Sequence, residues 1–151
     1  MNAKINILVA DDDEVVRRSY VRCLCGDHCK VHEAFDGVEA LLAMQEKPFD
    51  VVLLDLRMPG LDGMKVLETI KQCWPQSEVI VITGYPSIDT AKAAMELGAY
   101  DYLAKPVGPD EVVWAANGAA RQKRWALRIE SDNQQMEAST ARRTDNPVGA
   151  N

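Results

Sequence analysis

Two short segments of this chain are apolar at every position, and they constrain the fold more than any other feature. These segments are Val51–Leu54 and Val79–Ile82. A strand with one face in water alternates apolar and polar residues, whereas a strand covered on both faces is apolar throughout. The two segments therefore predict the central strands of a parallel sheet that is covered by helices on both faces.

The rest of the chain alternates β-rich apolar runs with amphipathic segments. The expected strands are 5–10, 30–34, 51–55, 79–83 and 100–104. The expected helices cover about 14–25, 37–46, 63–73 and 87–97, and a last one begins near Pro109. Asp36, Asp62 and Ser87 are typical helix-capping residues, and Gly98 favours a helix end. Five successive strand–helix units predict a doubly wound α/β domain with a five-stranded parallel sheet.

Charge and hydropathy exclude several classes of protein. The 151 residues include 17 Lys and Arg against 23 Asp and Glu, so the net charge is 17 − 23 = −6. Such an acidic surface does not favour direct nucleic-acid binding by this domain, because phosphate binding needs clustered cations. No apolar run exceeds five residues, whereas a membrane span needs about 20. We expect a cytoplasmic protein without a membrane segment.

The charge changes sign near the C-terminus. Residues 1–120 carry 11 cations and 19 anions (−8), whereas residues 121–151 carry 6 and 4 (+2). We expect a main domain over 1–122, a helical extension over 123–138 and a disordered tail over 139–151. Apolar side chains at helical spacing, Trp114, Trp125, Ile129 and Met136, fit either docking of a partner or second copy, or packing against the domain itself.

Cysteines and histidines cluster near the second expected strand. The cluster consists of Cys23, Cys25, His28, Cys29 and His32. Cys23 and Cys25 would lie on different faces of a helix, and the spacing is not that of a structural zinc site. We expect reduced, partly buried thiols here rather than metal ligands.

Polar residues follow four of the expected strands. Asp11 and Asp12 follow the first, Asp55 ends the third, Thr83 and Gly84 end the fourth, and Lys105 follows the fifth. In an open parallel sheet these strand ends meet at one edge. Clustered carboxylates suit a hard cation such as Mg²⁺, and an aspartate can attack a phosphoryl group. Lys105 and the Thr83 hydroxyl could then hold phosphoryl oxygens, with Gly84 leaving room for their entry.

The four segments that carry these residues resemble the receiver domain of two-component response regulators. They are residues 7–13, 51–63, 79–85 and 98–106, in this order. The resemblance covers about residues 4–122. It implies a flavodoxin-like sheet with strand order 2-1-3-4-5.

The resemblance also implies roles for individual residues. Asp55 would accept a phosphoryl group from a phosphohistidine. Asp12, Asp55 and the backbone carbonyl of Arg57 would bind Mg²⁺, for which Mn²⁺ could substitute, and Asp11 would act mainly through metal-bound water. Asp13 we expect to face solvent near a helix start, where a carboxylate is favoured.

Further roles concern the phosphoryl group and the response to it. Thr83 and Lys105 would contact the phosphoryl group, and the Lys105–Pro106 bond would be cis. Tyr102 would turn inward as the Thr83 hydroxyl moves, changing the surface of the fourth helix, fifth strand and fifth helix. Arg57 and Tyr85 occupy positions that tune the phosphoryl lifetime.

The implied partners are a sensor histidine kinase or histidine phosphotransfer protein and a downstream protein target. A homodimer could form through the fourth helix, fifth strand and fifth helix, or through the C-terminal extension. The domain would be no enzyme beyond catalysing its own phosphorylation and dephosphorylation.

Several alternatives stay open at this point. We favour a standalone receiver, but residues 100–106 resemble receivers of ATPase-type activators, so a fragment of a longer DNA-binding or ATPase regulator also fits. An aspartate-nucleophile phosphatase would carry a second acid at the position of Arg57. A flavin or nucleotide binder would need a phosphate-cradling loop where Asp11–Glu14 stand.

Overall fold

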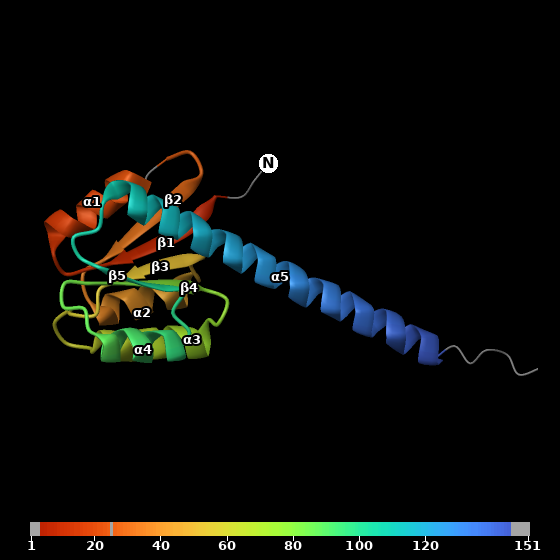
Figure 1. Cartoon of the computed structure of the whole chain (residues 1–151). Helices are drawn as coiled ribbons and strands as arrows, with labels where there is room; N and C mark the ends of the chain where they lie inside the picture. Colours follow the sequence, from red (N-terminus) through yellow and green to blue (C-terminus); the bar gives the residue numbers. More distant parts are fainter. Residues whose placement is uncertain (1–3, 25, 146–151) are drawn as a thin grey trace, which may run out of the picture.

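Five parallel strands form one sheet between two layers of helices (Figure 1). The computed structural model describes residues 4–24 and 26–145, with side chains up to residue 140. In chain order the elements are β1 Ile5–Ala10, α1 Glu14–Leu24, β2 Cys29–Ala34, α2 Gly37–Glu46, β3 Val51–Leu54, α3 Gly63–Cys73, β4 Glu78–Thr83, α4 Ile88–Glu96, β5 Asp101–Ala104 and α5 Pro109–Asp145. The strand order is β2-β1-β3-β4-β5, which confirms the predicted fold class.

Both faces of the central strands are buried, as their apolar runs predict. Leu54 and Val81 belong to the core beneath α2, α3 and α4, while Leu53 and Ile80 belong to the core beneath α1 and α5. Neighbouring residues of a strand point to opposite faces, so a run of apolar residues supplies both cores at once. Figure 1 shows α1 and α5 on one side of the sheet and α2, α3 and α4 on the other.

The helices begin at the predicted capping residues. The side chains of Asp36, Asp62 and Ser87 accept hydrogen bonds from backbone N–H groups in the first turns of α2, α3 and α4. Gly98 follows α4 with a φ of +103°, a backbone conformation that residues other than glycine rarely adopt. The local signals for these helix ends are therefore confirmed.

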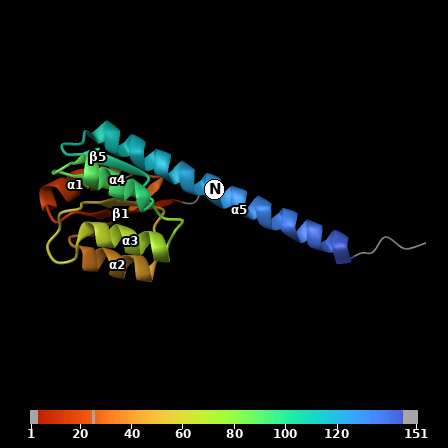
Figure 2. The ribbon, with the colours of Figure 1, turned by 60° about the horizontal axis from the view of Figure 1, so that its bottom comes forward.

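Helix α5 packs against the domain with its N-terminal part and then extends beyond it (Figures 1 and 2). Its first turns bury Val112, Ala116 and Ala119. Lys123 then forms an ion pair with Asp50, and the side chains of residues 131–140 are all exposed.

The helix ends later than the sequence suggests. The expected tail begins at residue 139, whereas α5 runs to Asp145; the rest of that tail, 146–151, lies outside the described residues. Trp125 is 58% exposed, so it does not pack back against the domain. The residues after 138 are mostly polar and form no apolar face for packing. No strong helix breaker precedes Pro147 in this segment, so the helix can continue into it.

The cysteines do not form a metal site within the described part of the chain. Cys23 and Cys73 are free thiols, and Cys25 lies outside the described residues. Among the residues described, acidic and other ligand-type side chains gather close enough to hold a metal only at Asp11, Asp12 and Asp55. In the same residues we find no helix with the length and apolar content needed to cross a membrane.

Candidate functional site

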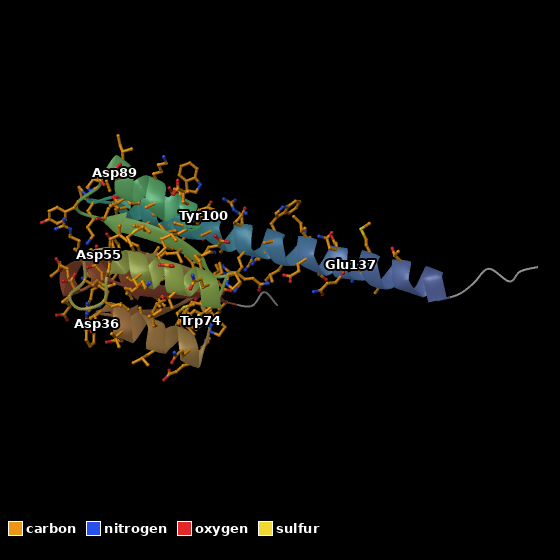
Figure 3. The ribbon with its side chains drawn as sticks, turned by 90° about the horizontal axis from the view of Figure 1, so that it is seen from below. Asp36, Asp55, Trp74, Asp89, Tyr100 and Glu137 are labelled. Atoms are coloured by element: carbon orange, nitrogen blue, oxygen red, sulfur yellow. The ribbon has the colours of Figure 1, made fainter. Side chains whose placement is uncertain are left out.

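The sheet brings the predicted polar residues to one edge. The ladder of backbone hydrogen bonds continues one residue past three strands: the N–H of Asp11 donates to Ala34, that of Asp55 to Ala10 and that of Lys105 to Thr83, at 2.8–3.1 Å. Each site residue is thereby held in the register of its strand. Figure 3 shows Asp55 at the same end of the domain as Asp36 and Asp89, opposite Trp74.

Three carboxylates converge at this edge. Asp11 and Asp55 are 2% and 5% exposed, whereas Asp12 is exposed to solvent. One oxygen of each lies within 4.8 Å of the others. Clustered carboxylate oxygens, two of them shielded and one open to solvent, fit a hard divalent cation that keeps some of its water.

Asp13 does not belong to this cluster. Its carboxylate accepts hydrogen bonds from the N–H groups of Val15 (3.0 Å) and Val16 (3.3 Å). It therefore caps the start of α1, where a negative charge also interacts favourably with the helix dipole. The expectation that Asp13 faces solvent at a helix start is confirmed.

Lys105 lies against the two buried carboxylates. Its Nζ is 2.8 Å from Asp11 Oδ2 and 3.4 Å from Asp55 Oδ2. The Lys105–Pro106 peptide bond is cis, as predicted. The ammonium group offsets part of the negative charge that the three carboxylates bring together.

Burial and charge shift the pKa values of this pair. Burial raises the pKa of Asp55 above its usual value; the backbone N–H of Arg57 opposes this shift, the nearby charge of Asp11 adds to it, and Lys105 opposes it. Burial alone would lower the pKa of Lys105, but its hydrogen bond and charge interaction with Asp11, together with Asp55, raise it overall. Lys105 therefore stays protonated at neutral pH, and Asp55 is a carboxylate with increased basicity.

Thr83 and the loop after it form the next side of the site. Thr83 is 1% exposed, and its Oγ1 accepts a hydrogen bond from the N–H of Tyr85 at 3.1 Å. At Gly84 the nearest atom to an added Cβ would be Lys105 Cδ, 3.8 Å away. The glycine therefore leaves open space beside the Lys105 side chain.

Two exposed side chains join the loops that follow Asp55 and Thr83. The guanidinium carbon of Arg57 lies 3.8 Å from the centre of the Tyr85 ring. This is a cation–π contact between the β3–α3 and β4–α4 loops. The sequence singles out both residues but does not indicate that they touch.

Tyr102, on β5, contacts the start of α4. Its hydroxyl accepts a hydrogen bond from the N–H of Ser87 (3.3 Å) and lies 2.7 Å from Thr90 Oγ1, which in turn lies 2.7 Å from Ser87 Oγ. The ring of Tyr102 is half-buried. The helix cap and the candidate switch residue therefore share one hydroxyl network.

Arg17 is a site neighbour that the sequence does not reveal. It donates to the backbone carbonyl of Asp11 at 2.9 Å and to Glu33 Oε1 at 3.0 Å. The sequence places Arg17 one helical turn after Asp13 but gives no local signal for its contact with Glu33. The two residues are 16 positions apart, and they meet because β1 pairs with β2.

A groove opens beside Lys105 between α1 and the loop after β5. Its lining residues are Val16, Ser19, Tyr20, Gly84, Lys105, Pro106 and Val107. Its lining is largely apolar apart from the lysine and two hydroxyl groups. Of the site residues, Gly84 and Lys105 line it.

Comparison with known proteins agrees with this geometry. Residues 7–117 match the family model of the response regulator receiver domain. The chain is 41% identical over 107 residues to the DNA-binding transcriptional regulator NtrC of Escherichia coli (strain K12), covering 71% of this chain and 23% of that protein. It is 37% identical over 111 residues to a putative NtrX-like response regulator of Rickettsia bellii, covering 72% and 23%. The chain thus spans about a quarter of the length of these relatives.

Solved structures show the same fold. The crystal structure of the receiver domain of NtrX from Brucella abortus matches with a TM-score of 0.71 and 34% identity, covering 76% of this chain and 98% of that one. A CheY-like receiver domain protein from Methanospirillum hungatei JF-1 matches with a TM-score of 0.79 and 25% identity, covering 82% and 99%.

Proposed function

This chain belongs to the response regulator receiver domain family, and we propose that Asp55 is the residue on which it accepts a phosphoryl group. One observation carries the proposal: Lys105 Nζ contacts both Asp11 and Asp55 at the sheet edge, with the third carboxylate, Asp12, beside them. A buried aspartate with a neighbouring ammonium group and further carboxylates suits nucleophilic attack on phosphorus.

In the proposed reaction, an Asp55 carboxylate oxygen attacks the phosphorus of a phosphohistidine. The new O–P bond forms as the P–N bond breaks, and the electron pair of that bond stays on the imidazole. The raised pKa of Asp55 increases its basicity as a nucleophile. Lys105 loses a carboxylate partner when Asp55 is esterified, so its ammonium group can pair with a phosphoryl oxygen instead.

Asp11, Asp12, Asp55 and the backbone carbonyl of Arg57 would hold Mg²⁺ or Mn²⁺. The bound cation would offset the negative charge of the carboxylates and of the incoming phosphoryl group. The Thr83 hydroxyl accepts a bond from Tyr85, so its own proton can be donated to a phosphoryl oxygen. Gly84 leaves that oxygen room to enter.

The proposed response begins at Thr83 and spreads through Tyr102. Movement of the Thr83 hydroxyl toward the phosphoryl group makes space into which Tyr102 can turn. Turning Tyr102 breaks its contacts with Ser87 and Thr90 at the start of α4. The α4–β5–α5 surface, where Ile88 and Trp114 are 86% and 76% exposed, would change as a result.

We further propose that a histidine kinase or a histidine phosphotransfer protein supplies the phosphoryl group in the cytoplasm. Autocatalytic phosphorylation from a small phosphodonor belongs to the same proposal. The output is a protein contact, either with a separate partner or with further domains such as those of the longer relatives.

Intact-mass spectrometry after incubation with acetyl phosphate tests the acceptor. We expect a Mg²⁺-dependent phosphoryl adduct on the wild type that is absent from Asp55→Asn. Asp13→Asn is the matched control, because asparagine caps a helix as well as aspartate does and Asp13 lies outside the carboxylate cluster. An adduct that persists in Asp55→Asn would show that another residue is the acceptor.

A further inference from the structure

The Arg17 side chain bridges strand β2 and the residue that follows β1. Its Nε donates to Glu33 Oε1 at 3.0 Å, and its Nη1 donates to the carbonyl oxygen of Asp11 at 2.9 Å. The Arg17 side chain is 12% exposed, whereas the next residue, Arg18, is 61% exposed. Arg17 is therefore held in one place by two directed hydrogen bonds.

Asp11 forms hydrogen bonds through its N–H, its carbonyl oxygen and both carboxylate oxygens, and Arg17 donates to the carbonyl oxygen. The N–H of Asp11 donates to Ala34, and its two carboxylate oxygens accept from the N–H of Asp13 and from Lys105. The carbonyl oxygen that Arg17 contacts belongs to the peptide plane between Asp11 and Asp12. Because a peptide unit is planar, holding its oxygen also orients the backbone of the next residue.

That next residue is Asp12, whose side chain is exposed. Packing therefore does little to direct its carboxylate, and the direction depends on the backbone that carries it. Asp12 is also the cluster member through which solvent and a cation can enter, since Asp11 and Asp55 are buried.

We propose that Arg17, oriented by Glu33, is a positioning residue that aims the Asp12 carboxylate and thereby sets the affinity of the site for divalent cations. This inference rests on the proposed function, because it assumes that the carboxylate cluster binds Mg²⁺ or Mn²⁺. Residues that orient metal ligands typically change metal affinity by about 10–100-fold when removed.

A purely electrostatic role for the pair makes a different prediction. Removing the Arg17 cation would strengthen cation binding, and removing the Glu33 anion would weaken it. Positioning requires both residues, so removal of either one weakens binding. The sign of the effect of removing Arg17 therefore separates the two explanations.

The experiment measures metal binding directly on the full chain without any phosphodonor. Mn²⁺ binding is followed by the loss of the free-ion paramagnetic resonance signal, and Mg²⁺ binding by calorimetry. We expect Arg17→Met and Glu33→Ala each to weaken binding about tenfold. Arg18→Met, which removes the same charge from the same helix, should bind as the wild type does. Binding by Arg17→Met that equals or exceeds that of Arg18→Met overturns the proposal.

Thermal unfolding of each variant guards against a loss of fold. If Arg17→Met does not fold, Arg17→Lys carries the test, because a lysine keeps the charge but its compact ammonium cannot reproduce the two-sided bridge. Weaker binding by Arg17→Lys supports positioning, and wild-type binding overturns it. Failure of the proposed function itself looks different: the wild type would bind no Mn²⁺ and would take no phosphoryl group on Asp55.

Discussion

At the scale of single residues, Asp55 is held in a site that penalises its charge. Burial raises its pKa, and Asp11 adds to that shift. When the pKa of a carboxyl group is higher in the folded than in the unfolded state, the free energy of unfolding falls as the pH rises from the unfolded to the folded pKa. The unphosphorylated site therefore lowers the stability of the domain at neutral pH.

This gives a prediction for Asp55→Asn without metal. At pH 7 we expect its unfolding temperature to exceed that of the wild type by a few degrees, on the order of 1 kcal/mol. Below about pH 3 the wild-type carboxyl group is protonated in both states, and the difference should vanish. Differential scanning calorimetry in EDTA at several pH values measures it; a less stable Asp55→Asn at pH 7 would contradict the assignment of burial as the main cause.

A second prediction concerns the contact between Arg57 and Tyr85 and the lifetime of the phosphoryl group. Their cation–π contact joins the loops after Asp55 and Thr83, and an exposed contact of this kind contributes about 0.5–1 kcal/mol. We expect Tyr85→Ala to shorten the lifetime of the Asp55 phosphoryl group about two- to fivefold, because the loops separate more readily and admit water. Tyr85→Phe keeps the aromatic face and should keep the lifetime. The decay of the adduct mass measures both, and equal decay in Tyr85→Ala and the wild type would contradict the role.

At the scale of elements, the start of α4 depends on side chains from another element. Ser87 caps the helix, and Tyr102 on β5 reaches both Ser87 and Thr90. Residues that hold a helix end through a half-buried hydroxyl network can release it when one hydroxyl moves. In the proposed response, the coupling between the site and the α4–β5–α5 surface therefore lies at the first turn of α4.

Thr90→Val tests that coupling because it keeps the shape of the side chain and removes the hydroxyl. We expect faster hydrogen exchange of the amides in the first two turns of α4 and little change elsewhere. Thr69→Val on α3 is the control, since the Thr69 hydroxyl donates to the carbonyl oxygen of Lys65 within its own helix. Unchanged exchange in Thr90→Val would show that the Ser87 cap alone holds the helix start.

Helix α3 depends on Gly63 for a different reason. A Cβ on Gly63 would lie 2.5 Å from the backbone of Leu56, so the chain would have to move. We expect Gly63→Ala to lower the free energy of unfolding by about 2 kcal/mol or more. Gly26→Ala is the comparison, because nothing lies within 4 Å of the added Cβ there. Urea unfolding measures both; similar midpoints for the two variants would contradict the steric reason.

At the scale of the whole molecule, α5 changes from a packed helix to an exposed one. Val112–Ala120 supply buried residues, Lys123 pairs with Asp50, and the side chain of Glu130 accepts a hydrogen bond from Gln76 at 2.8 Å. Residues 131–140 are all exposed. A helix without tertiary packing is only marginally stable in water.

We therefore expect the amides of 131–140 to exchange much faster than those of 112–120 at low protein concentration. Protection of 131–140 that increases with concentration, together with a larger sedimentation coefficient, would show that a second copy covers this segment, which includes the exposed Met136. Slow exchange in a chain that sediments as a monomer would contradict the expected marginal stability of this segment.

Local sequence signals determined most of the fold of this protein. Continuous apolar runs predicted the buried strands, and capping residues such as Asp36 and Ser87 predicted the helix starts, because both depend on residues within a few positions of one another. The carboxylate cluster with Lys105 could also be predicted, since parallel strands end at one edge. Composition alone placed the end of α5 too early, because a polar segment can be helical or disordered.

Only the tertiary structure decided which side chains meet between elements. The contacts of Arg17 with Glu33, Arg57 with Tyr85 and Lys123 with Asp50 join residues 16–73 positions apart. Each depends on how the strands pair and twist, and on which rotamer the packed neighbours allow. These quantities arise from the whole set of contacts in the folded chain, so no short stretch of sequence carries a signal for them.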